Sequence, residues 1–142
     1  MRKLGECRLL TLASPAYIAQ HGEPRHPADL RHHECLIYAS DSAVSTWAYR
    51  DQEQTLAVQV RGRIVANNGV ALTEAASRGM GITRQPDFIA APYLERGKVQ
   101  PVLQAFENAP LGIYAVLPSN RYIPHRVSVL IEHLARTLTA AS

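Results

Sequence analysis

Short apolar runs alternate along this chain with stretches of helical period. Residues 56–61 alternate apolar and polar side chains, which is typical of a half-buried strand, and with residues 47–50 and the polar residues 51–54 they predict a hairpin. Further short strands are predicted at residues 7–13, 36–38, 64–66, 81–86, 99–103 and 112–117.

Helix signals lie between these strands. Ser14 and Pro15 predict a helix over residues 15–21 that ends at Gly22, and a second helix is expected over residues 70–78. Residues 88–95 are expected to be helical in pieces, interrupted at Pro92, and a final helix opens at Pro124. That helix carries the clearest apolar stripe of the chain, formed by Val127, Leu130, Ile131, Leu134 and Leu138. Strands alternating with helices predict an α/β fold whose sheet is covered on both faces.

The composition excludes several classes of protein. The chain has 142 residues, enough for one domain or two small lobes, and its 46% apolar and 19% charged residues exclude a disordered chain. The net charge of +3 is dispersed, so no nucleic-acid-binding arm is expected. The uninterrupted apolar stretch at residues 9–13 is too short for a signal peptide or a membrane span. We therefore expect a cytoplasmic protein without a membrane partner.

The polar residues do not form a recognisable catalytic or metal set. Four histidines, His21, His26, His32 and His33, precede Glu34 and Cys35, but prolines interrupt the segment, so no metal site is expected. There is no nucleophile elbow and no phosphate or dinucleotide loop in the sequence. We expect neither an enzyme nor a cofactor.

The turn formed by Asn67, Asn68 and Gly69 carries the most functional weight. It stands between a strand and a helix, where free N–H groups and the helix dipole favour a carboxylate or phosphate. The same residues also suit a plain turn with a helix cap. Both interpretations stay open at this point.

An ordered set of short motifs spans nearly the whole chain. The motifs include LASPAYIAQHG at 12–22, PADL at 27–30, HECL at 33–36, NNG at 67–69, GMGI at 79–82 and PDF at 86–88. Together they resemble the effector-binding domain of LysR-type transcriptional regulators. The resemblance implies a two-lobed fold like that of periplasmic binding proteins, with a small-molecule effector held between the lobes.

The resemblance also implies how the chain is divided. Residues 1–13 would be a crossover strand from lobe one, residues 14–118 the second lobe, and residues 119–142 a C-terminal helix that normally packs on lobe one. The chain would then be an N-terminally truncated sensor domain. In such regulators promoter DNA is bound by an N-terminal winged helix-turn-helix, so DNA would be reached only through that absent domain.

By the same resemblance, six residues would form the second-lobe wall of the effector site. They are Tyr38, Ser40, Asn67, Asn68, Gln85 and Pro86, while Arg84 stands where many relatives have an apolar residue. The expected partners are a small organic acid and further copies of the chain in a homo-oligomer. The alternative is a stand-alone small-ligand-binding protein of the periplasmic-binding class, which the lack of a signal peptide disfavours.

Overall fold

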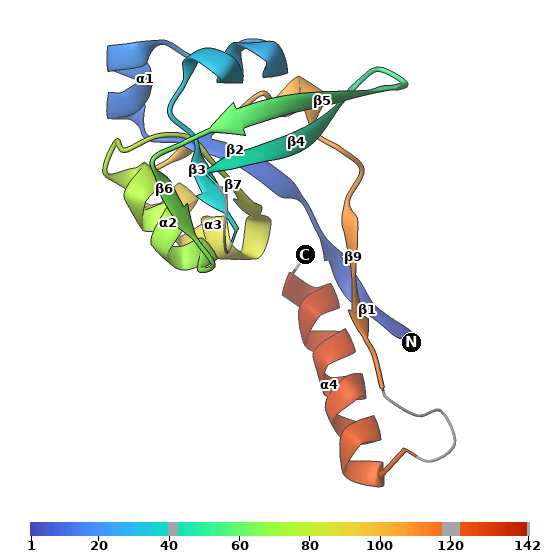
Figure 1. Cartoon of the computed structure of the whole chain (residues 1–142). Helices are drawn as coiled ribbons and strands as arrows, with labels where there is room; N and C mark the ends of the chain where they lie inside the picture. The colour runs from blue at the N-terminus through green and yellow to red at the C-terminus, as the bar shows by residue number, and fades with distance from the viewer. Residues whose placement is uncertain (40–42, 118–122, 142) are drawn as a thin grey trace. The chain divides into compact units, whose positions relative to one another are not determined.

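The computed structural model describes residues 1–39, 43–117 and 123–141, with side chains described up to residue 138. The chain divides into two compact units, Leu9–Asn108 and Met1–Arg8 with Ala109–Ser142 (Figure 1). The expected division after residues 13 and 118, and the assignment of either unit to a lobe, stay predictions.

A mixed sheet forms the centre of the unit Leu9–Asn108. Strand β2 (Leu9–Ala13) lies between β7 (Thr83–Pro86) and β8 (Gln100–Val102) and is antiparallel to both. Strand β3 (Leu36–Tyr38) pairs in parallel with β6 (Ile64–Ala66). A parallel bridge between Cys35 and Ile82, with Leu36 N–H donating to Ile82 O at 2.8 Å, links β3 to the segment leading into β7. The strand order is therefore β6-β3-β7-β2-β8, and the predicted α/β class is confirmed.

Alternate residues of these strands enter two separate apolar clusters. Leu10, Leu12 and Leu36 pack with α2 (Gly69–Ser77) and α3 (Asp87–Glu95) on one face. Ala13 and Ile37 face the other way, toward α1 (Pro15–His21), η1 (Pro27–His32) and the hairpin of β4 (Val44–Asp51) and β5 (Gln54–Arg61). This two-fold alternation is what a sheet covered on both faces requires.

Local signals set most of the helix ends. Ser14 Oγ accepts a hydrogen bond from Tyr17 N–H at 3.0 Å, and Gly22 ends α1 with φ of 85°. A short 3-10 turn, η2 (Gln104–Phe106), follows β8. The expected interruption at Pro92 is wrong, because α3 continues through it. A proline at this place in a short helix removes one intrahelical bond, to the carbonyl of Phe88, and the buried Ala90 anchors the turn around it.

The strand expected at residues 7–13 is confirmed over Leu9–Ala13, but its extension back to Cys7 is wrong. Arg8 separates β2 from β1 (Arg2–Cys7), which pairs with β9 (Leu111–Ala115) in the second unit. Helix α4 (His125–Ala141) packs against β1, and a Cβ placed on Gly5 would lie 3.2 Å from Leu138 Cβ. Within its own unit the apolar stripe of α4 is only partly covered, since Leu130 is 54% and Leu134 36% exposed. None of the described helices has the length and apolar character needed to span a membrane.

Candidate functional site

Several strands of the central sheet end at one edge. Strands β3 and β6 run in parallel to Tyr38 and Ala66, which are register partners, and β7 runs the same way to Pro86. Strand β2 is antiparallel, so its first residue, Leu9, lies beside Pro86 at this edge. Ligands of open α/β sheets bind beyond the carboxyl ends of the strands. This edge is therefore the place to look for a site.

A pocket of about 390 Å³ opens at this edge, entirely within the unit Leu9–Asn108. Its volume is in the range of sites for small organic molecules. Its lining comes from the sheet edge, from β4 and from the first turn of α3, and consists of Leu9, Tyr38, Ser45, Thr46, Trp47, Arg84, Gln85, Pro86 and Ile89. The structure thus brings together three of the six residues expected in the effector site, Tyr38, Gln85 and Pro86.

The predicted residues in the pocket differ in their exposure to solvent and in their contacts. Tyr38 is 60% exposed, so its ring is accessible from solvent. Gln85 is buried, and its Nε2 donates to Thr83 Oγ1 at 3.0 Å. A Cβ on Gly69 would lie 2.5 Å from Gln85 Oε1, so the start of α2 confines this amide from behind. Gln85 is a fixed part of the wall, whereas Tyr38 lies at its open side.

Arg84 is the one cation among the nine described residues that line the pocket. Its Nη1 donates to the carbonyl oxygen of Ala48 at 2.6 Å, and its guanidinium carbon lies 5.4 Å from the ring centre of Trp47 and 5.3 Å from that of Tyr49. Burial lowers the pKa of Arg84, although a guanidinium remains protonated in water at any ordinary pH. The group is a positive charge held over two aromatic rings.

The aromatic support of Arg84 is itself fixed from behind. Tyr49 is buried, its hydroxyl lies 2.8 Å from Thr11 Oγ1, and burial raises the pKa of Tyr49 to about 12. The Ala48 carbonyl that accepts from Arg84 also accepts from Asn108 Nδ2 at 2.7 Å. The guanidinium is therefore oriented by groups from β2, β4 and the segment after η2.

The asparagine turn lies beside the pocket. Asn67 and Asn68 are exposed and are not among its lining residues. Asn68 Oδ1 accepts from Ala71 N–H at 3.1 Å, so Asn68 caps α2, and Gly69 directly follows it against Gln85 and Ile89. The capping interpretation of Asn68 is confirmed, and a contact of either asparagine with ligand stays a prediction. Ser40 lies outside the described residues.

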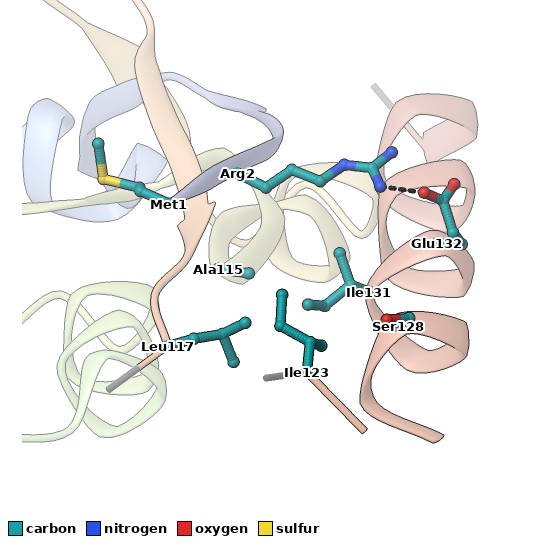
Figure 2. Close-up of a pocket in the computed structure, with 8 residues that line it drawn as sticks. All are labelled: Met1, Arg2, Ala115, Leu117, Ile123, Ser128, Ile131 and Glu132. Carbon is teal, nitrogen blue, oxygen red and sulfur yellow. Dashed lines mark hydrogen bonds and ion pairs between the residues drawn. The ribbon is translucent and has the colours of Figure 1, made fainter. Parts of the chain in front are cut away.

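The second unit holds a different pocket, of about 310 Å³, shown in Figure 2. Its walls include Leu117, Ile123 and Ile131, and the charges at its edge, Arg2 and Glu132, pair with each other. The two charged side chains among its described lining residues therefore compensate each other. Within the described ranges, no three His, Cys, Asp or Glu side chains come together in a way that could hold a metal ion.

Sequence reasoning missed most of the residues contributed by the hairpin. Trp47, on the predicted hairpin, is 6% exposed and also lines the pocket. Ser45 belongs to the polar loop that follows the strand predicted at residues 36–38, whereas Thr46 carries no sequence signal for a site. Arg84 did stand out, because by the resemblance it stands where many relatives have an apolar residue.

Comparisons with known proteins agree on one family. A family profile described as the LysR substrate binding domain matches residues 1–139. The HTH-type transcriptional regulator PtxR of Pseudomonas aeruginosa is 34% identical over 136 residues, which cover 96% of this chain and 44% of PtxR. An HTH-type transcriptional regulator of Haemophilus influenzae is 32% identical over 127 residues, covering 89% of this chain and 44% of the relative.

Solved structures give the same result. The regulatory domain of CrgA, a LysR-type transcriptional regulator from Neisseria meningitidis, superimposes with a TM-score of 0.81 at 28% identity, over 96% of this chain and 67% of that one. Full-length AphB, the Vibrio cholerae virulence activator, gives a TM-score of 0.80 at 28% identity, over 96% of this chain and 47% of AphB. The chain spans less than half the length of the two sequence relatives described above.

Proposed function

The chain belongs to the LysR substrate-binding domain family, and from this premise we propose that its pocket at the sheet edge binds the effector of a LysR-type transcriptional regulator. The observation that carries the proposal is the convergence of Tyr38, Gln85 and Pro86 on one pocket of suitable size. These relatives are regulators rather than enzymes, which fits the expectation of a protein without catalytic activity.

The effector is a small organic anion in this proposal. None of the nine lining residues is acidic and one of them is a cation, which supports an anionic ligand. The pocket also lies next to the first turn of α2, where Asn67 and Asn68 would contribute amide donors at the rim. Ser40, next but one after Tyr38 in the chain, completes the set implied by the resemblance.

The remaining parts of the proposal concern the whole regulator. PtxR and its counterparts are described as HTH-type regulators, so promoter DNA would be bound by a helix-turn-helix segment and not by the residues described here. The regulator would act in the cytoplasm as a homo-oligomer. Effector binding would then alter how the subunits hold DNA.

A thermal-unfolding screen with small organic acids tests the site. Compounds that raise Tm are titrated against the wild-type chain, Tyr38→Ala and Tyr114→Ala. Tyr38 lines the pocket, while Tyr114 is a similarly exposed tyrosine in the other unit, 47% against 60%. We expect Tyr38→Ala to weaken binding about tenfold or more, since an aromatic contact is lost, and Tyr114→Ala to bind normally. Equal binding by both variants would contradict this placement of the effector.

A further inference from the structure

The guanidinium of Arg84 has one polar partner among the described residues and a fixed position. One of its five N–H donors goes to the Ala48 carbonyl, and its face is covered by Trp47 and Tyr49. Trp47 and Tyr49 are 6% and 2% exposed, so these rings are themselves held by packing. An arginine oriented in this way gives up little further side-chain freedom when it binds a ligand.

Among the described residues, Arg84 has no carboxylate as a counter-ion. The described ion pairs include Arg2 with Glu132, Lys3 with Glu6, Arg63 with Glu34 and Arg78 with Glu74, and no described carboxylate lies within ion-pair distance of Arg84. Burying a cation partly is unfavourable when no anionic partner replaces the water that it loses. Burial accordingly lowers the pKa of Arg84. A carboxylate that enters the pocket would remove this penalty.

The other walls of the pocket limit what else the ligand can carry. Leu9, Pro86 and Ile89 are apolar, and Tyr38 offers an accessible ring. A second negative charge on the ligand would lie against these apolar side chains, with no cation to pair with among the described lining residues. A phosphate is usually held by several charged groups, which this lining does not provide. One charge beside an apolar wall fits a molecule with one carboxylate and a flat apolar body.

We propose that Arg84 is the specificity-determining residue of this pocket and that it selects a planar monocarboxylate, aromatic or unsaturated, over neutral molecules of the same shape. This inference rests on the proposed function, because it names the ligand class of the same pocket. The carboxylate would accept from the remaining guanidinium N–H groups. The apolar body would pack against Tyr38, Pro86 and Ile89.

The fluorescence of Trp47 gives a direct assay, since it is the single tryptophan of the chain and lines the pocket. The wild-type chain is titrated with benzoate, with the neutral isostere benzamide, with the dicarboxylate terephthalate and with inorganic phosphate. Calorimetry provides the second measure of each Kd. We expect benzoate to bind about tenfold or more tightly than benzamide, because the neutral amide keeps one acceptor oxygen but loses the negative charge that strengthens hydrogen bonds to the guanidinium. Terephthalate and phosphate should bind more weakly than benzoate.

Three variants assign the preference to Arg84. Arg84→Gln should make the Kd values of benzoate and benzamide equal, whereas Arg84→Lys should keep part of the preference because it keeps the charge. Arg63→Gln is the matched control, since it removes the same charge from a side chain that is 92% exposed and outside this pocket. It should leave both Kd values unchanged. The Tm of each variant reports whether it folds.

The wild-type comparison alone can overturn the inference, so the test survives a variant that fails to fold. Equal Kd values for benzoate and benzamide, or no saturable binding of benzoate, would overturn it. A benzoate preference that persists in folded Arg84→Gln would overturn the role of Arg84. If neutral compounds bind as tightly as benzoate and lose affinity in Tyr38→Ala, the inference of a carboxylate ligand is wrong, but the proposed effector site is still supported.

Discussion

Gly62 is the position where the structure tolerates a side chain least. It follows β5 and leads the chain toward β6, and its own N–H donates to Ala43 O at 3.2 Å. A Cβ at Gly62 would lie 1.6 Å from the carbonyl oxygen of Cys35 and 2.7 Å from its carbonyl carbon. Real Cβ atoms keep at least 3.0 Å from such neighbours. Gly62→Ala therefore has to move one backbone segment past the other.

The magnitude follows from the hydrogen bonds that this movement disturbs. Cys35 N–H donates to Arg61 O at 3.1 Å, and Leu36 N–H, one residue on, donates to Ile82 O at 2.8 Å. An unsatisfied buried amide costs about 1–3 kcal/mol and overpacking another 1–3 kcal/mol, so we expect a loss of about 3–5 kcal/mol in the free energy of unfolding. For a unit of this size that corresponds to a Tm about 12–20 °C lower.

The matched control is Gly97→Ala, measured by thermal and urea unfolding alongside Gly62→Ala. Gly97 has φ of 67°, and no atom lies within 4 Å of the place that a Cβ would take, so only the left-handed backbone opposes alanine there. That strain costs about 1–2 kcal/mol. If Gly62→Ala lowers Tm no more than Gly97→Ala, the close approach of residues 35 and 62 is not a real constraint. The same displacement should disturb β3 and the position of Tyr38, so Gly62→Ala should also weaken ligand binding.

Two other residues separate stability from binding. Asn68→Ala should lower the free energy of unfolding by about 1 kcal/mol, whereas Asn68→Ser keeps a capping oxygen and should keep Tm. If the Asn68 amide also donates to the effector, Asn68→Ser weakens Kd by up to about tenfold in calorimetry; an unchanged Kd would confine Asn68 to capping. Burial first, and then the charge of His21, lower the pKa of His33 from 6.5. The unfolded chain therefore protonates first, and stability present above pH 6.5 is lost as the pH falls through that value toward the folded pKa. The urea midpoint should fall more in wild type than in His33→Asn between about pH 8 and about pH 5, and equal falls would contradict the assignment.

Much of the fold could be predicted from the sequence because its signals are local. Ser14, Pro15 and Gly22 specify α1, and the alternation over residues 56–61 specifies most of β5. The errors arose where tertiary contacts decide. Arg8 interrupts an apolar run, but this alone does not divide the strand. Strands β1 and β2 are separate because they pair with different partners: β1 pairs with β9, and β2 pairs with β7 and β8. Pro92 is tolerated because α3 is held by a buried face and not by its hydrogen bonds alone.

The candidate site was predictable where it depends on strand ends. Tyr38 and Pro86 end strands that run in parallel, so their meeting at one edge follows from the predicted sheet. Trp47 and Ser45 reach the pocket because the hairpin folds over the sheet, and nothing local in the sequence states which face it covers. Asn68 carries a signal that a cap and an anion site share, and a sequence cannot separate the two.

The pattern of polar residues on β7 gives a physical reason to place function here. A strand covered on both faces is normally apolar on both, yet β7 carries Thr83, Arg84 and Gln85. Thr83 and Gln85 satisfy each other on the helix side of the sheet. Arg84, which pairs in register with Thr11, faces the hairpin and finds one carbonyl and two rings but no described carboxylate. Burial of an unpaired charge is unfavourable for folding alone, so its place at the edge where the strands end is best explained by a ligand that completes it.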